Sequence, residues 1–483
     1  MSTYYGRQQE QSEFHGVMAK KTSSLVTCQG RRRIGKSRFI RECAKGADVF
    51  LEFSGLPPRP GLTKHEQLAV FAEQLAKQTR APLLKLESWP SAFQLLSSQL
   101  PDKGTVVILL DEISWMGIGE PDFAGHIKNA WDELFSRRAK TVVVLCGSVT
   151  SWIEENILNN TGFVGRCSWQ FHLQPLSLTE CAQFWGRAGS RISTTEKLRF
   201  LAATGGIPRY LEELNVKETA EQNIARLCFH PSGMLFNEFD SIFHDIFNRK
   251  ASTYRQIVHA LVDGAKGVDE ISRRIGRERG GSLSLALSDL ESSGFVKKDV
   301  PPSVSGGTSK TIRPGQRHLR YRLSDNYLRF YLKYVEPNRA QISKSRFKST
   351  ALEQLDQWDT IMGLQFENLV LENLDAVLKA LKLPRHLVLS AGPYHQNRTQ
   401  RRTGCQIDLL IQTKRCIYLC ELKFKGQIAP RVIKEVDQKV AALKVPKTKS
   451  VRTVLIYDGN LAPIIEEEHV FDFLIPSHEL FAN

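Results

Sequence analysis

The segment GRRRIGKS at residues 30–37 constrains the fold of this chain more than any other feature of its sequence. It fits the pattern G-x-x-x-x-G-K-S completely, follows the apolar run SLVTCQ and opens a helical pattern at Ser37. In such a strand–loop–helix unit, backbone N–H groups and a helix N-terminus converge on a phosphate group. Gly30 and Gly35 permit the tight loop, Lys36 supplies a positive charge, and the Ser37 hydroxyl can ligate Mg²⁺. The segment therefore predicts a P-loop site for ATP and Mg²⁺.

A second segment, which ends in two acidic residues, supplies the other half of this predicted site. TVVILLDE at 105–112 ends in Asp111 and Glu112, which we expect at the C-terminal end of a buried strand. Ligands of open α/β sheets bind at that edge. We expect Asp111 to hold Mg²⁺ through water and Glu112 to polarise the attacking water. The alternative is a glycine–lysine turn and an unrelated acidic strand end.

Residues 20–215 alternate between apolar runs and helical patterns. This alternation predicts a parallel sheet with helices on both faces. We expect strands at 24–29, 49–54, 105–110, 141–146 and 169–173, with helices at 65–78 and 92–100 among those between them.

Size and composition set further bounds. A chain of 483 residues suggests about three domains. No apolar run approaches the roughly 20 residues that cross a bilayer, and the start MSTYYGRQQEQ lacks the apolar core of a signal peptide, so a cytoplasmic protein without membrane contact is expected. The nine cysteines lack metal-type spacing. The net charge of +15 indicates a polyanionic partner, with a solvated basic surface as the alternative.

Several motifs in the first 215 residues occur in the order of a known family. They are YGRQQEQ at 5–11, GRRRIGKS, LLDEISWM at 109–116, LCGSVTSW at 145–152, GRCSWQFHLQPLS at 165–177 and TGGIPRYL at 204–211. The chain resembles the archaeal-ATPase family, which comprises AAA+/STAND-type P-loop proteins with a C-terminal domain of restriction-endonuclease type. This resemblance implies an ATPase fold for the N-terminal part.

The resemblance also assigns roles to individual residues. It places Tyr5, Gly6 and Arg7 near the adenine and makes Ser148 a polar sensor of the γ-phosphate. Arg166 becomes an arginine-finger candidate that acts on a neighbouring subunit of a homo-oligomer. The resemblance also places a lid turn at Gly205, Gly206 and Pro208, with Arg209 beside it. Apart from the resemblance, Arg33 and Arg38 in and next to the P-loop are expected to bind the nucleotide. The alternatives are a solvated arginine, a strand-end serine and a helix-terminating turn.

Residues 253–296 predict a winged helix. TYRQIVHALVD at 253–263, GVDEISRRIG at 267–276 and GGSLSLALSDLESSGFV at 280–296 read as helices followed by a hairpin-like segment. The second helix of such a pair normally enters the major groove of DNA. Here the presumed recognition helix, 282–293, contains no basic residue, which argues against sequence-specific reading and a role in transcription. Protein docking is the alternative function.

The segment that follows is strongly basic. Between residues 296 and 350, thirteen basic residues face three acidic ones. Phosphate contacts from such a stretch supply affinity without sequence choice. We therefore expect nucleic acid to bind the 297–348 region, with DNA favoured over RNA. The basic residues are Lys297, Lys298, Lys310, Arg313, Arg317, Arg320, Arg322, Arg329, Lys333, Arg339, Lys344, Arg346 and Lys348.

Two predicted strands near the C-terminus carry a second set of chemical groups. CQIDLLIQ at 405–412 contains Asp408, and CIYLCELKF at 416–424 contains Glu421 and Lys423 on the same face as Ile417. A buried carboxylate needs compensation, which a divalent cation shared with Asp408 would provide. This set resembles the D…E-x-K pattern of PD-(D/E)xK nucleases. The resemblance implies that Asp408 and Glu421 hold Mg²⁺ and that Lys423 orients or helps to deprotonate the attacking water.

Further residues fit this resemblance, and one departs from it. Glu367 lies on the preceding predicted helix as an extra metal-site acid, and Gln438 and Lys439 lie on the helix after the E-x-K strand. Ile407 stands where the proline of the motif would be. An exposed Glu–Lys pair on an ordinary strand is the alternative.

These observations predict an α/β chain with three parts. They are a P-loop ATPase domain with a parallel sheet at 1–215, a helical linker with a winged helix at 216–345, and a restriction-endonuclease-like α/β domain at 346–483. The expected function is ATP hydrolysis coupled to nucleic-acid binding and Mg²⁺-dependent DNA cleavage. The alternative is a non-cleaving ATP-dependent switch whose nuclease-like domain docks nucleic acid or a protein.

Overall fold

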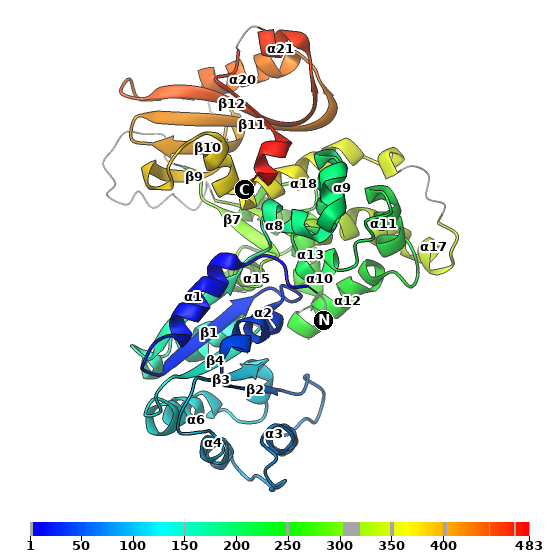
Figure 1. Ribbon diagram of the computed structural model, residues 1–483. Helices are drawn as coiled ribbons and strands as arrows, with labels where there is room; N and C mark the ends of the chain where they lie inside the picture. The colour runs from blue at the N-terminus through cyan, green and yellow to red at the C-terminus, as the bar shows by residue number, and fades with distance from the viewer. Residues whose placement is uncertain are drawn as a thin grey trace. The chain divides into compact units, whose positions relative to one another are not determined.

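The computed structural model divides into two compact units, Met1–Pro175 and Leu176–Asn483 (Figure 1). It describes residues 3–148, 150–247, 251–302, 319–347, 352–398, 403–443, 445–467 and 470–482.

The first unit is built on a five-stranded sheet whose paired strands all run parallel, in the order β2-β3-β4-β1-β5. The strands are β1 (Ser24–Gly30), β2 (Val49–Ser54), β3 (Val106–Asp111), β4 (Thr141–Gly147) and β5 (Cys167–Leu173). All five expected strands are therefore present, with ends shifted by at most two residues. Because β4 lies between β1 and β3, the residue after β4 is placed between the P-loop and the end of β3.

Both faces of this sheet are buried along the central strands β1, β3 and β4, as the apolar runs predicted, whereas the edge strand β5 is partly exposed. On one face, Phe14 and Phe39 pack on Phe171 with ring centroids 5.9 and 5.4 Å away. The opposite face contributes Leu25, Phe53, Ile108 and other alternate strand residues to a larger core. The helices of the unit are α1 (Gln8–Met18), α2 (Lys36–Cys43), α3 (Lys64–Thr79), α4 (Trp89–Ser98), α5 (Ile113–Met116), α6 (Phe123–Ala130) and α7 (Thr150–Ile153).

The second unit begins with helices and continues into a small sheet. The helices are α8 (Leu178–Ala182), α9 (Thr194–Thr204), α10 (Pro208–Leu211), α11 (Ala220–Cys228), α12 (Met234–Phe247), α13 (Ala251–Ala260), α14 (Val268–Ile275), α15 (Gly281–Ser292), α16 (Asn326–Phe330) and α17 (Arg339–Ser343). The strands β6 (Lys266–Gly267), β7 (Val296–Asp299) and β8 (Arg320–Leu323) form an antiparallel sheet in the order β6-β8-β7. Helices followed by a hairpin are the expected order of elements, and the winged-helix assignment stays a prediction.

The C-terminal part contains a mixed sheet in the order β13-β12-β11-β10-β9. Its strands are β9 (Val388–Gln396), β10 (Cys405–Thr413), β11 (Cys416–Ile428), β12 (Ser450–Leu461) and β13 (Phe473–Pro476). The first three are antiparallel, whereas β12 pairs in parallel with β11 and β13. The helices are α18 (Trp358–Glu372) and α19 (Leu374–Ala380) before the sheet, α20 (Arg431–Ala442) between β11 and β12, and α21 (Pro463–Glu467).

Helix α18 is joined to the earlier part of the second unit through buried amide side chains. Gln365, fully buried, donates to the Ala202 carbonyl at 2.6 Å and the Asn326 carbonyl at 2.7 Å. Asn368 donates to the carbonyl of Leu323 at 2.9 Å. Because buried amides need these partners, α18 is held in a fixed register against the helices and strands before it. The boundary expected at 345/346 therefore lies inside one compact unit, and the three expected domains stay a prediction.

In the described part of the chain, no helix combines the length and the apolar character that a membrane span requires.

Candidate functional site

The loop after β1 has the backbone conformation that a phosphate cradle requires. Gly30 has a φ of +145°, and a Cβ added there would lie 2.6 Å from the Leu173 carbonyl oxygen. Gly35, with a φ of +88°, is the N-cap of α2, and Arg33 has a φ of +70°. Positive φ values are strained for residues with side chains, which explains glycine at the two motif positions.

Lys36 is buried, and its ammonium lies within this loop. Its Nζ donates to the carbonyl oxygens of Gly30 at 3.0 Å and Arg31 at 3.3 Å. It also donates to the Ser148 hydroxyl at 2.9 Å. Lys36 therefore links the loop to the residue that follows β4.

Asp111 and Glu112 lie at the same edge of the sheet. The Ser37 hydroxyl donates to Asp111 Oδ2 at 2.6 Å. Glu112 accepts hydrogen bonds from the Ser148 hydroxyl at 2.9 Å and the Ser148 N–H at 3.3 Å. Its φ of +48° is left-handed, a conformation that costs energy for a glutamate and is often found at functional sites. The structure thus brings Lys36, Ser37, Ser148, Asp111 and Glu112 into one hydrogen-bonded group.

The N-terminal segment is fastened beside the loop. Arg7 is 3% exposed and donates through Nη2 to the carbonyl oxygens of Ile34 at 3.1 Å and Gln174 at 2.9 Å. Arg38 donates to the Thr3 carbonyl at 2.9 Å and lies over the Tyr4 ring at 5.7 Å. The carbonyl of Gly6, which follows Tyr5, accepts from the Gln11 amide at 2.9 Å. Arg7 therefore ties the P-loop to the end of β5.

The donor set of this edge fits a magnesium nucleotide. A hydroxyl and a carboxylate, the hard oxygen ligands that Mg²⁺ prefers, meet at Ser37 and Asp111. The loop N–H groups, the start of α2 and the Lys36 ammonium suit the phosphates. The binding roles of these residues, and those of Tyr5, Gly6, Arg7, Arg33 and Arg38, stay predictions.

Arg166, the expected arginine finger, lies in an ion pair within its own chain. Its Nε and Nη2 donate to the two Asp132 oxygens at 2.7 and 2.9 Å. Hydrogen bonds from Arg166 and Lys128 lower the pKa of Asp132 to about 2. Arg166 is therefore already paired, and an action on another subunit requires it to exchange that partner.

The expected lid turn belongs to the second unit. A Cβ at Gly206 would lie 2.4 Å from the Leu176 carbonyl oxygen, and Gly205 has a φ of +64°. Arg209, which follows Pro208, forms ion pairs with Glu212 at 3.3 Å and Glu213 at 2.8 Å. The turn thus requires its glycines, while its predicted role as a lid stays a prediction.

The carboxylates of the C-terminal sheet lie on neighbouring strands. The Leu422 N–H donates to Asp408 Oδ2 at 2.9 Å, which holds Asp408 of β10 beside β11. Glu421 is 2% exposed and forms ion pairs with Lys423, at 2.8 Å, and with Lys439. Lys423 also pairs with Glu435 at 3.1 Å. Two lysines therefore compensate the buried Glu421 charge, for which a shared divalent cation was expected from the sequence.

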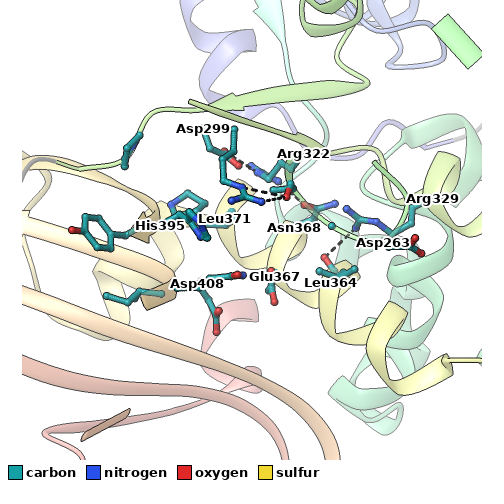
Figure 2. Close-up of a pocket in the computed structure, with 18 residues that line it drawn as sticks. Asp263, Asp299, Arg322, Arg329, Leu364, Glu367, Asn368, Leu371, His395 and Asp408 are labelled. Carbon is teal, nitrogen blue, oxygen red and sulfur yellow. Dashed lines mark hydrogen bonds and ion pairs between the residues drawn. The ribbon is translucent and has the colours of Figure 1, made fainter. Parts of the chain in front are cut away.

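Glu367 and Asp408 line one cavity of about 180 Å³ (Figure 2). Burial, together with the neighbouring Glu421 and Glu367 charges, raises the pKa of Asp408 well above its usual value. Burial likewise raises the pKa of Glu367, against the effect of Arg329. No group of three His, Cys, Asp or Glu side chains placed to hold a metal ion occurs among the described residues. The roles of Glu367, Asp408 and Glu421 as metal ligands stay predictions.

On α20, the residue that contacts the carboxylates of the sheet is Lys439 and not Gln438. Gln438 is exposed, whereas the adjacent Lys439 contacts Glu421. On a helix, adjacent residues point in directions about 100° apart, so only one of them can face the sheet. The sequence identified the correct turn of α20 but could not select Lys439.

The basic 297–348 region is only partly a surface. Arg322 and Arg329 are 6% and 2% exposed, and Arg339 pairs with Asp240 at 2.8 Å. An exposed basic surface remains at Lys297, Lys298, Lys344 and Arg346. Lys310, Arg313, Arg317 and Lys348 lie outside the described residues. The two buried arginines are therefore not part of this exposed surface, and phosphate binding by the 297–348 region stays a prediction.

Comparisons with known proteins place the fold. A Walker-type ATPase of Pyrococcus abyssi is similar at a TM-score of 0.52 and 15% identity, over 68% of this chain and 96% of that chain. The ORC2 protein of Aeropyrum pernix, solved with ADPNP and ADP, gives a TM-score of 0.41 at 12% identity, over 72% and 97%. In sequence, an uncharacterised protein of Methanocaldococcus jannaschii is 22% identical over 430 residues, 87% of this chain and 88% of that protein.

A family model described as archaeal and bacterial proteins of unknown function matches residues 331–439. The matched segment contains Glu367, Asp408, Glu421, Lys423 and Lys439. The restriction-endonuclease-like part of the expected resemblance is not among these findings. Together with the parallel sheet and its P-loop, the structural similarity shows that this chain has the fold of a Walker-type P-loop ATPase.

Proposed function

We propose that this protein binds ATP with Mg²⁺ and hydrolyses it at the edge of the first sheet. The observation that carries the proposal is the hydrogen-bonded group around the P-loop. Ser37 lies 2.6 Å from Asp111, and Lys36 is joined to Glu112 through Ser148. Motifs separated by about 75 residues in sequence thus meet as nucleotide hydrolysis requires.

Each residue of this site has a role that follows from its chemistry. The loop N–H groups and Lys36 bind the phosphates, and Ser37 and Asp111 hold Mg²⁺, which supplies charge neutralisation on the phosphate oxygens. Glu112 accepts a proton from, or orients, the attacking water. Ser148 touches both Lys36 and Glu112, so it holds the Glu112 carboxylate in place until a γ-phosphate competes for the same donors.

Steady-state hydrolysis of ATP, read together with ATP binding, tests these roles. Lys36→Ala removes the phosphate-binding charge and should abolish both binding and turnover. Glu112→Gln keeps the shape of the side chain, so it should retain binding and lower kcat by about 100-fold or more. The matched control is Glu73→Gln on α3, an exposed carboxylate, which should leave both unchanged. Hydrolysis of ATP by Glu112→Gln at the rate of wild type would show that Glu112 takes no part in the reaction.

Nucleic-acid binding with cleavage by the second unit is a second candidate function. It is supported by the order of the elements that carry the pattern: Glu367 lies on α18 before the sheet, Asp408 lies on β10, and Glu421 and Lys423 lie on the neighbouring strand β11. Asp408 and Glu367 line one cavity there, and Lys423 contacts Glu421.

A cleavage assay decides between this candidate and the non-cleaving switch. Wild type and Asp408→Asn should be incubated with single- and double-stranded DNA and RNA, with EDTA, Mg²⁺ or Mn²⁺. Cleavage by wild type that Asp408→Asn loses supports the nuclease. Cleavage that survives this substitution excludes Asp408, and a wild type that cuts no substrate favours the switch.

A further inference from the structure

Helix α3 lies beside the edge strand β2 and satisfies its outer backbone groups with glutamine side chains (Figure 1). Gln78 accepts from the Glu52 N–H at 2.8 Å and donates to the Glu52 carbonyl at 2.8 Å. Gln74 makes the same two contacts with Ser54, at 2.9 and 3.1 Å. Four residues of helix and two residues of strand both advance by about 6–7 Å, so these glutamines meet alternate residues of β2.

Gln67 continues this series and makes a third contact that the other two glutamines do not make. It is 2% exposed. Its Oε1 accepts from the Leu56 N–H at 2.9 Å, and its Nε2 donates to the Leu56 carbonyl at 3.1 Å. The same Nε2 donates to the carbonyl of Trp115, on α5, at 2.9 Å. Gln67 therefore uses an acceptor and both donors of its amide group, and it joins the segment after β2 to α5.

Helix α5 begins directly after the two carboxylates of the proposed nucleotide site. The Trp115 N–H donates to the Glu112 carbonyl at 2.8 Å, and Glu112 has a φ of +48°. A Cβ at Gly55 would lie 2.7 Å from the Met116 nitrogen, so the residue after β2 packs directly on α5. Asp111, by contrast, belongs to β3 and pairs with β2 in the sheet. The Glu112 backbone therefore depends on where α5 lies, whereas the sheet itself holds Asp111.

We propose that Gln67 is a positioning residue for ATP hydrolysis, which holds the Glu112 carboxylate in place through α5. A left-handed glutamate persists only where the surrounding structure fixes it, and Gln67 supplies that support by binding Trp115. A carboxylate that polarises the attacking water loses much of its effect when it is misplaced by about 1 Å. This inference rests on the proposed role of Glu112 in hydrolysis, but the contact itself can be tested without a nucleotide.

Hydrogen–deuterium exchange without nucleotide tests whether Gln67 holds α5. Gln67→Met keeps a long, unbranched side chain that favours helix, and removes the amide group. It should speed the exchange of the backbone N–H groups of residues 115–117 about tenfold relative to those of β4, the effect of losing a buried hydrogen bond. The matched control is Gln78→Met, which removes the two contacts with Glu52 and should leave residues 115–117 unchanged. Unchanged exchange there in Gln67→Met contradicts the proposal.

The kcat for ATP hydrolysis and the Kd for ATP with Mg²⁺ test whether this contact matters for the reaction. Gln67→Met should lower kcat about tenfold and change Kd less than threefold, because the groups that bind the phosphates and Mg²⁺ are not moved. Gln78→Met should retain both values. If Gln67→Met does not fold, Gln67→Glu decides and should lower kcat in the same way. Its carboxyl group has at most one donor, which cannot serve the carbonyls of both Leu56 and Trp115.

Two outcomes contradict the positioning role specifically. They are a wild-type kcat in Gln67→Met despite faster exchange of α5, and an equal loss of kcat in Gln78→Met. Absence of ATP hydrolysis in wild type would contradict the proposed function and, with it, the positioning role. The exchange measurement would still show whether Gln67 holds α5, so the two failures are distinguishable.

Discussion

The Asp132 carboxylate binds the Arg166 guanidinium through two hydrogen bonds, and this pair has a measurable pH dependence. Its folded-state pKa of about 2 lies below the value of about 4 in an unfolded chain. The ionised carboxylate therefore stabilises the fold above about pH 4, and this contribution is lost as the pH falls towards 2.

Asp132→Asn should lower the melting temperature at pH 7 by no more than about 4 °C, because both partners are partly exposed. The difference between variant and wild type should shrink as the pH falls from 4 to 2, as followed by thermal melts. Asp102→Asn, at a fully exposed carboxylate, serves as the control. An unchanged difference across this pH range would mean that the pair does not form in solution.

At the scale of single residues, the sequence could indicate Lys36, Ser37, Asp111 and Glu112 because the motif chemistry is local. It could not indicate that Arg166 is paired with Asp132, or that Glu421 is paired with Lys439. Such contacts join residues 34 and 18 positions apart and depend on how helices dock on strands. Arg329 is a similar case, since its basic side chain resembles a surface residue until its burial is known.

At the scale of elements, the expected strands were found because buried apolar runs bounded by polar residues favour one structure. The residues from 49 to 54 and from 405 onwards show this, with β2 and the start of β10 where they were expected. The burial of α18 was less accessible to prediction. Its contacts with the preceding helices run through Gln365 and Asn368, and polar residues inside a helix carry no periodic signal of burial.

Two glycines of the second unit provide a test of how tightly its elements approach one another. A Cβ at Gly206 would lie 2.4 Å from the Leu176 carbonyl oxygen, a backbone atom that cannot turn away. A Cβ at Gly363, inside α18, would meet nothing within 4 Å. Gly206→Ala should therefore lower the free energy of unfolding by about 1–3 kcal/mol.

Gly363→Ala should raise the free energy of unfolding by up to about 1 kcal/mol, because alanine favours helix more than glycine does. Urea denaturation followed by circular dichroism measures both variants. Equal effects of the two substitutions would contradict the close approach of the Gly206 turn to Leu176.

At the scale of the whole molecule, the net charge of +15 favours a polyanionic partner. The exposed basic residues of the described surface indicate where such a partner would bind. Lys297 and Lys298 are exposed neighbours on β7. Each lost phosphate contact reduces the slope of log K against log[salt] by about 0.7–0.9. The double variant Lys297→Glu, Lys298→Glu should therefore reduce the slope for DNA binding by about 1.5, measured by fluorescence anisotropy.

The matched control is the double variant Lys20→Glu, Lys21→Glu, which reverses the charge of two exposed lysines of the first unit and changes the net charge by the same amount. It should leave the slope nearly unchanged. An equal effect of both double variants would mean that net charge, and not the β7 surface, governs binding.

We propose that the P-loop and the end of β3 form one site for ATP and Mg²⁺. Calorimetric titration of ATP, in Mg²⁺ and in EDTA, tests it most directly. Wild type should bind ATP more tightly in Mg²⁺ than in EDTA. Asp111→Asn and Ser37→Ala should bind ATP with the same affinity in both buffers, because they lack a Mg²⁺ ligand. Lys36→Ala should bind ATP in neither buffer. ATP binding by Lys36→Ala with the affinity of wild type would contradict the account.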